Sequence, residues 1–113
     1  MKVVNTVYDI TISPERQYVI VCNKHSGNWA GCVLFWGSLT EDHEKRSFGG
    51  YTTGVDRCER YTMDEILSFS SDMFTEYRPG MTWQEFRACE NVIIQPACLE
   101  DLGLSTMKIW YKP

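Results

Sequence analysis

The chain has 113 residues, a formal net charge of −4 and a hydrophobic content of 43%. We expect a single domain over residues 1–113, because a second hydrophobic core within this length would be too small to be stable. Ordinary amounts of glycine and proline exclude a wholly disordered chain. The 11 basic residues are scattered, which argues against direct nucleic-acid binding, since that function normally needs clustered Lys and Arg.

The first half of the chain predicts strands that are joined by short turns. Val4 to Ile12 alternates apolar and polar residues, which is typical of a half-buried strand. After the turn Ser13–Arg16, the segment Gln17–Asn23 is apolar on both faces, which suits a central strand. Ala30–Trp36 is a third apolar strand. The short connections favour an antiparallel meander.

A polar stretch from Ser38 to Ser47 follows and predicts a loop. Its charged run Glu41–Arg46 mixes both signs, as solvated surface segments usually do. Phe48–Thr53 contains two glycines and predicts either a short fourth strand or an extended segment with close backbone approach.

Two helix starts of the same kind come next. Thr62 is followed by Glu65 and Thr82 by Glu85, so in each case a hydroxyl and a carboxylate can satisfy free backbone N–H groups reciprocally. We expect the first helix to end before Arg78-Pro79-Gly80 and the second to run from about Trp83 to Cys89. The apolar stripe of the first helix comprises Met63, Ile66, Leu67, Ser70, Met73 and Phe74.

The last part of the chain predicts further strands. Val92–Ile94 is a compact strand that Pro96 ends, Leu99–Gly103 is a turn or single helical turn, and Thr106–Tyr111 is a closing strand. If this closing strand is uncovered, it could pair with a second copy of itself and form a homodimer. The predicted fold is α+β, with an antiparallel sheet of about five strands and two helices packed on one face.

The five cysteines bear on location and metal binding. Their odd number and the absence of a leader pattern favour free thiols and a cytoplasmic protein. No apolar run approaches the length of a membrane span, so we expect no membrane association. A zinc site could combine Cys22, His25 and Cys32, but these residues lack the paired short spacings of structural zinc sites. We therefore expect no metal and no cofactor.

The middle third of the chain carries a pattern of motifs. The apolar strand Val33–Gly37 is followed by Gly50–Thr53, Asp56 and the helix start Arg60–Glu65. This arrangement resembles small uncharacterised proteins that are encoded by phages and prophages, in which Phe-Trp-Gly leads into Gly-Tyr-Thr, an Asp and a Tyr-Thr-x-x-Glu helix start. The resemblance implies a phage or prophage origin and brings no established activity with it.

The segment 49–61 is the strongest candidate for a site, because its glycines, hydroxyls and charged groups could line a groove for a small polar ligand or a peptide. In a simpler structural interpretation, Tyr51 packs on the sheet, Asp56 stabilises a turn and the arginines lie on the surface. With an exposed tryptophan added, the candidate binding residues are Trp29, Tyr51, Thr52, Asp56, Arg57 and Arg60.

Two functions from different classes follow. No catalytic constellation stands out, so we expect a non-catalytic, phage-encoded interaction module that binds and inhibits a host protein, such as a CRISPR effector. An acidic face could occupy a nucleic-acid channel on such a target. The alternative is a small-molecule or nucleotide-binding protein that sequesters its ligand with the 49–61 segment.

Overall fold

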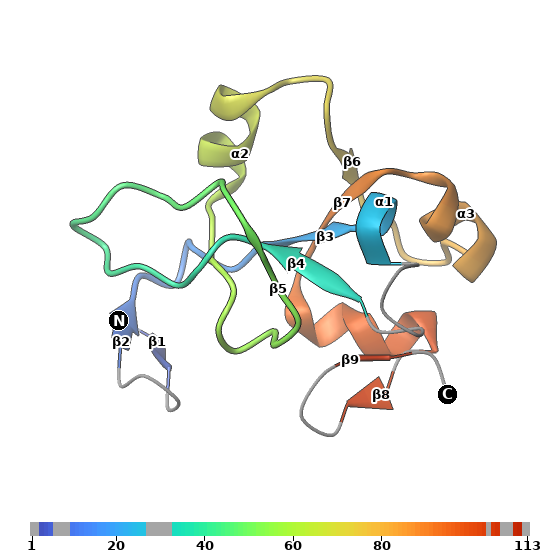
Figure 1. The fold of residues 1–113 in the computed structure, drawn as a ribbon, viewed down its shortest axis with the longest axis horizontal. Coiled ribbons are helices and arrows are strands. Elements are labelled where there is room, and N and C mark those ends of the chain that lie inside the picture. Colours follow the sequence, from blue (N-terminus) through green and yellow to red (C-terminus); the bar gives the residue numbers. More distant parts are fainter. Residues whose placement is uncertain (1–2, 6–9, 27–32, 104, 107–109, 112–113) are drawn as a thin grey trace.

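A computed structural model describes residues 3–5, 10–26, 33–103, 105–106 and 110–111. Its centre is a five-stranded sheet in the order β5-β4-β3-β7-β6 (Figure 1). The strands are β3 (Val19–Cys22), β4 (Leu34–Trp36), β5 (Tyr51–Thr52), β6 (Thr75–Glu76) and β7 (Asn91–Ile94). Neighbours are antiparallel except β6 and β7, which are parallel. The α+β class and the central position of β3 are confirmed, whereas the sheet is mixed instead of purely antiparallel.

The described residues include four helical segments beside the sheet. They are α1 (Asn23–Ser26), α2 (Met63–Phe69), α3 (Trp83–Ala88) and the 3-10 helix η1 (Pro96–Leu102). Both capping boxes are confirmed: the Thr62 hydroxyl accepts from the Glu65 N–H at 3.1 Å, and the Thr82 hydroxyl accepts from the Glu85 N–H at 3.0 Å. The Glu side chains accept in return from the Thr backbone N–H groups. The sequence therefore locates both helix starts correctly.

Helix α2 is shorter than the apolar spacing predicts. It ends at Phe69, and Ser70 already has extended backbone. The Ser70 hydroxyl lies 3.0 Å from the Asp72 carboxylate, a local polar contact that competes with helix continuation. Met73 and Phe74 consequently leave the helix, and Met73 is about half exposed.

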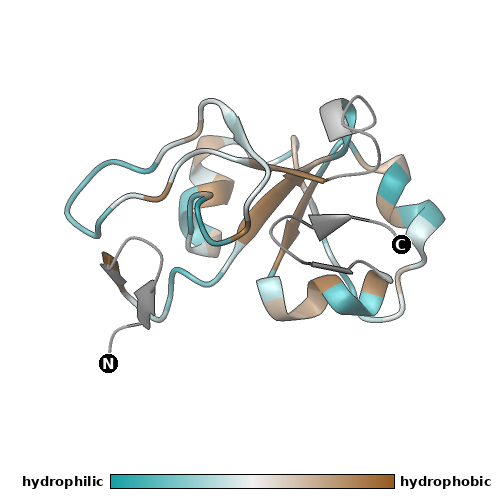
Figure 2. Cartoon of the chain, turned by 60° about the horizontal axis from the view of Figure 1, so that its bottom comes forward, coloured by the Kyte–Doolittle hydropathy of each residue, from teal (hydrophilic) through white to brown (hydrophobic). Residues whose placement is uncertain are grey.

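The prediction that both helices pack on one face of the sheet is not confirmed. Phe86 of α3 packs with Val19 and Val21 of β3, while Ile66 of α2 packs with Ile20. Successive residues of a strand point to opposite faces, so α2 and α3 cover opposite faces of β3. Figure 2 shows that the hydrophobic residues are concentrated on these central strands. The physical reason is that β3 and β7 are fully buried on both sides and need a cover on each.

Each end of the chain forms a separate two-stranded sheet. β1 (Val3–Asn5) pairs antiparallel with β2 (Ile10–Ile12), and β8 (Ser105–Thr106) with β9 (Trp110–Tyr111). The single strands predicted at both ends are therefore wrong, because each predicted strand consists of two shorter strands that pair antiparallel with each other. Among the described residues, no helix has both the length and the apolar character needed to traverse a bilayer.

Candidate binding surface

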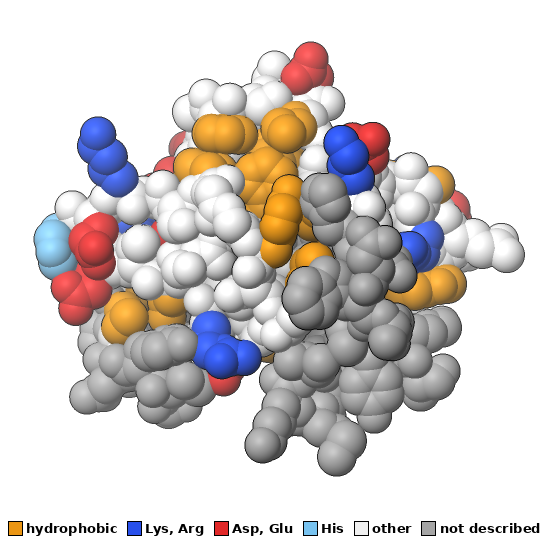
Figure 3. Space-filling view, viewed as in Figure 1, with side chains coloured by type: hydrophobic (Ala, Val, Ile, Leu, Met, Phe, Trp, Pro, Cys, Tyr) orange, Lys and Arg blue, Asp and Glu red, His pale blue; other side chains and the backbone are white. Residues whose placement is uncertain are grey.

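Four large apolar side chains are about half exposed and lie in or near α2. They are Tyr51, Leu67, Phe69 and Met73, with exposed fractions of 48%, 47%, 50% and 47%. We call these four residues the α2 patch. Figure 3 shows a band of hydrophobic side chains on this face of the molecule. Isolated exposed apolar residues are normal, but a group of them on one surface marks a site of interaction.

An aromatic cluster around Trp36 lies beneath Tyr51 and Phe69 of the α2 patch. The Trp36 ring makes edge-to-face contacts with Tyr51, Phe69 and Phe74 at centroid distances of 6.4, 6.1 and 5.2 Å. Trp36 itself is only 6% exposed, and its Nε1–H donates to the Asn91 side-chain oxygen at 3.0 Å. The exposed rings therefore rest on a side chain that the core holds in one orientation. This preorganises the part of the patch that Tyr51 and Phe69 form.

A pocket of about 550 Å³ lies between the loop after β4 and α2. Four carboxylate side chains line it: Asp42, Glu44, Asp64 and Glu65. Two cationic and two aromatic side chains also contribute: Lys45, Arg46, Phe48 and Phe69. Phe69 belongs to both the pocket and the α2 patch, so the two features are continuous.

Arg46 forms a fixed part of the pocket wall, and its side chain is only 7% exposed. Its Nε lies 3.4 Å from a carboxylate oxygen of Glu65. Its Nη2 donates to the backbone oxygens of Glu41, Asp42 and Glu44 at 2.9, 3.1 and 2.6 Å. The buried Nη1 has no hydrogen-bond acceptor among the described residues. Arg46 thus joins the loop to α2 and neutralises one of the four carboxylates.

Glu59 is fully buried and holds the loop on the core. Its carboxylate is 2.7 Å from Nη2 of Arg16. It also accepts from the backbone N–H groups of Thr40, Ser47 and Arg60 at 3.0, 2.8 and 3.0 Å, and from the Thr40 hydroxyl. A buried charge is tolerated only when it is paired and hydrogen-bonded in this way. The position of the pocket wall therefore depends on Glu59.

The residues predicted for the 49–61 segment do not form one site. Tyr51 is in the α2 patch, and burial, followed by the nearby Cys22, raises the pKa of its hydroxyl. Thr52 pairs with Phe35 within the sheet. Trp29 lies outside the described residues. No residue of the segment lines the pocket between the loop and α2.

The charged residues of segment 49–61 agree in part with the simpler interpretation, in which Asp56 stabilises a turn and the arginines lie on the surface. The Arg60 guanidinium donates to the backbone oxygen of Val55 at 2.6 Å, so it stabilises its own loop. Gly54 accepts from the backbone N–H groups of Arg57 and Cys58 at 3.1 Å, which forms the turn that carries Asp56. Arg57 is exposed and Asp56 is partly buried.

Burial limits the reactivity of the Cys58 thiol. Cys58 is fully buried, and loss of solvation raises the pKa of its thiol to about 12, so it is protonated at neutral pH and a poor nucleophile. Of the three residues considered for a zinc site, Cys22 is buried, while Cys32 and the His25 side chain lie outside the described part of the chain.

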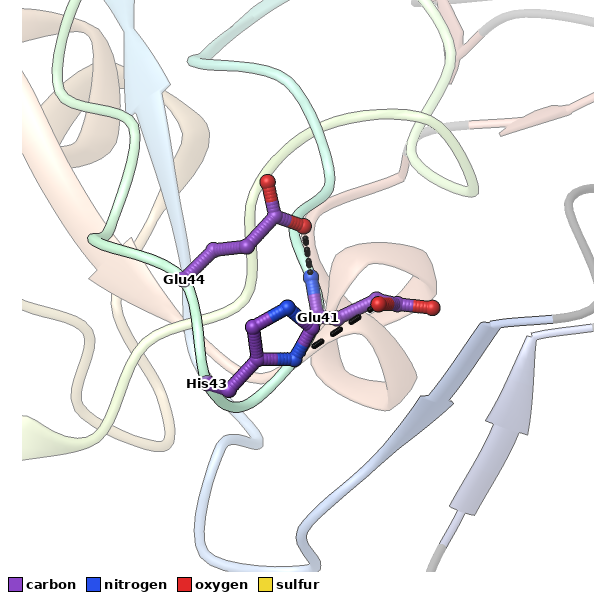
Figure 4. Close-up of side chains that lie close together, drawn as sticks. All are labelled: Glu41, His43 and Glu44. Carbon is purple, nitrogen blue, oxygen red and sulfur yellow. Dashed lines mark hydrogen bonds and ion pairs between the residues drawn. The ribbon is translucent and has the colours of Figure 1, made fainter.

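One cluster of possible metal ligands was missed by sequence reasoning, which treated its residues as a solvated loop. Glu41, His43 and Glu44 have ligand atoms that all lie within 4.8 Å of one another (Figure 4). Their contacts also have a local explanation. A Glu44 carboxylate oxygen accepts from the Glu41 N–H at 2.9 Å, and His43 Nδ1 is 3.6 Å from Glu41. All three side chains are exposed, as the solvated-loop interpretation expects.

The candidate surface thus consists of the α2 patch and the adjoining pocket, both built on Phe69. Its elements come from segments that are distant in sequence, since β5, the loop after β4 and α2 all contribute. Comparison with protein-family models, curated proteins and solved structures finds no match to this chain.

Proposed function

We propose that the protein is a non-catalytic module that binds and inhibits a host protein, and that the α2 patch is its contact surface. The observation that carries this proposal is the half exposure of Tyr51, Leu67, Phe69 and Met73, of which Tyr51 and Phe69 rest on the buried Trp36 ring. Aromatic residues and Met are enriched in protein interfaces, and a few such residues usually supply most of the binding energy. A rigid surface also loses little conformational entropy when it binds.

The concrete form of the proposal is inhibition of a bacterial defence protein, such as a CRISPR effector. Two features support it: the resemblance of the middle third of the chain to phage proteins and the net charge of −4. An acidic partner can compete with nucleic acid for a basic channel. The modest charge means that the apolar contact supplies most of the affinity.

The test compares Leu67→Glu with Gln84→Glu. Both positions are exposed on helices and both changes add one negative charge, but Gln84 is on α3, which covers the opposite face of the sheet. Each variant should retain its free energy of unfolding within about 0.5 kcal/mol, as surface changes usually do. The wild-type chain and Gln84→Glu should capture the same bacterial protein from lysate, and Leu67→Glu should lose it.

Inhibition is tested in cells that carry an active CRISPR system. Expression of the wild-type chain or of Gln84→Glu should raise the plating efficiency of a targeted phage, and expression of Leu67→Glu should not. Capture that survives Leu67→Glu would refute the patch as the contact surface. An unchanged plating efficiency with the wild-type chain would refute inhibition of that defence system.

A small-molecule-binding function is the second candidate, and the pocket beside Phe69 is the observation that favours it. Its volume of about 550 Å³ falls within the usual range for ligand sites. Four carboxylates against two cations would repel the phosphates of a nucleotide, which places this function second. A thermal-shift screen with uncharged metabolites and nucleotides checks it, because a bound ligand raises the melting temperature.

A further inference from the structure

We infer that the pocket between the loop and α2 receives a basic side chain of the protein partner, and that arginine fits it better than lysine. This inference deepens the proposed function and rests on it. It names what the partner must place next to the apolar residues that contact the α2 patch.

The charge of the pocket lining favours a cationic occupant. Four carboxylates and two cations give a formal excess of two negative charges, 4 − 2 = 2. Asp42 is engaged, with its Oδ1 2.8 Å from the Arg16 guanidinium, and Glu65 is paired with Arg46. Glu44 and Asp64 are both exposed at the rim and face a single further cation, Lys45. A cation that enters the pocket therefore meets a negative potential.

The aromatic side chains of the pocket lining favour a flat cation. The rings of Phe48 and Phe69 are stacked, with centroids 4.2 Å apart and planes within 7° of each other. Phe69 nevertheless remains 50% exposed. A guanidinium can stack its flat face on an aromatic ring while its N–H groups reach carboxylates, which a compact ammonium group cannot do in the same way. This combination favours arginine.

The pocket is continuous with the α2 patch, so one partner segment can contact both. The stretch from Tyr61 to Glu76 contains four acidic residues and no Lys or Arg. Its half-exposed apolar side chains are Leu67, Phe69 and Met73, so this stretch combines apolar contacts with acidic residues and has no basic ones. The complementary partner segment has apolar anchors with a basic residue beside them.

An anionic occupant is disfavoured by the same geometry. Of the two lining cations, only Lys45 is exposed, because the unpartnered Nη1 of Arg46 is buried out of reach of solvent. An anion in the pocket would therefore meet one accessible cation and the two exposed carboxylates of Glu44 and Asp64.

The probe for this inference is N-acetyl-arginine amide, added to the ¹⁵N-labelled wild-type chain and followed by NMR. The control is N-acetyl-citrulline amide, which has nearly the same shape and no charge. The arginine probe should shift the backbone amides of residues 44–48 and 64–69 and bind at least about fivefold more tightly than the citrulline probe, as expected for a cation over an aromatic ring near carboxylates. Added salt should weaken the arginine probe only.

Matched variants locate the site. Asp64→Asn should weaken binding of the arginine probe about threefold, because it removes one rim carboxylate. Asp101→Asn makes the same change at an exposed position on η1, whose Leu99 packs against the other face of the sheet, and should leave binding unchanged.

Three results would overturn the inference: equal binding of the citrulline probe, an equal loss in both variants, or tighter binding of N-acetyl-glutamate amide. Each is independent of the partner-capture experiment. If the arginine probe fails while Leu67→Glu still abolishes capture, the pocket assignment is wrong and the proposed function stands.

Discussion

The carboxylate of Glu59 and the guanidinium of Arg16 meet at 2.7 Å in the interior, where their side chains are 0% and 4% exposed. Replacing Glu59 with Gln leaves Arg16 with a buried charge that Asp42 alone must balance. Removing one partner of a buried ion pair is strongly destabilising, so we expect Glu59→Gln to lower the free energy of unfolding by about 3 kcal/mol. Urea denaturation measures this loss.

The control for that change is Glu41→Gln in the same loop. Glu41 is exposed, so its substitution should change stability by less than about 0.5 kcal/mol. Hydrogen exchange gives a second readout, since the amides of Thr40 and Ser47 donate to Glu59 and should exchange faster in Glu59→Gln. Equal stability of the two variants would contradict the role assigned to Glu59.

Gly37 and Gly50 provide a matched pair for backbone strain. Both have positive φ, +73° and +78°, which non-glycine residues adopt at a cost of about 1 kcal/mol or more. A Cβ at Gly37 would also collide with the backbone oxygen of Ser47, whereas a Cβ at Gly50 meets no atom within 4 Å. We expect Gly37→Ala to lose about 2 kcal/mol more than Gly50→Ala. Thermal denaturation of both variants checks this, and similar losses would argue against the collision.

The two capping boxes should contribute similar amounts of stability. Thr62→Ala and Thr82→Ala each remove a hydroxyl that accepts from the third helical N–H, which typically costs about 1 kcal/mol. Ser71→Ala, at an exposed bend, serves as the control. Chemical denaturation of the three variants measures these losses. A Thr62→Ala variant that is as stable as Ser71→Ala would refute the cap assignment.

Alkaline pH should destabilise the protein. Burial raises the pKa of Cys58 from 9.0 to about 12, and burial, followed by the nearby Glu59, raises the pKa of Tyr61 above its ordinary value of 10.0. The folded state thus holds these protons more tightly than the unfolded state. The resulting stability is complete below about pH 9 and declines as the pH rises further, by up to about 1.4 kcal/mol per pH unit for each group.

Urea midpoints measured at a series of alkaline pH values test this prediction. Cys58→Ser removes one of the two titrating groups while keeping a hydrogen-bonding side chain, so its stability should fall less steeply than that of the wild-type chain between about pH 9 and about pH 12, the interval in which Cys58 titrates. A stability profile of the wild-type chain that stays flat above pH 9 would show that neither group titrates differently on unfolding.

Local signals predict the helix starts but not the helix lengths or faces. The Thr62 and Thr82 caps depend only on residues three positions away, so the sequence locates them correctly. The end of α2 is set by competition between apolar spacing and the polar residues that begin at Ser70, which the spacing alone does not reveal. The pattern of β3, apolar on both faces, predicted a central strand, but the sequence alone did not show which helix covers which face.

The candidate surface was less predictable. Tyr51 was selected from the sequence and is part of the α2 patch, whereas Arg60 binds its own loop. The pocket combines residues 42–48 with residues 64–69, and no local pattern connects these segments. The ion pair between Arg46 and Glu65 and the stacking of Phe48 on Phe69 bring these segments together. Neither contact corresponds to a recognisable sequence pattern.

The placement of α2 and α3 on opposite faces of β3 has a consequence for how this protein could change over time. The α2 patch lies above one half of the interior, while the other half is closed by α3 and η1. Substitutions in the α2 patch can therefore accumulate on one side without disturbing the packing that keeps the opposite side folded.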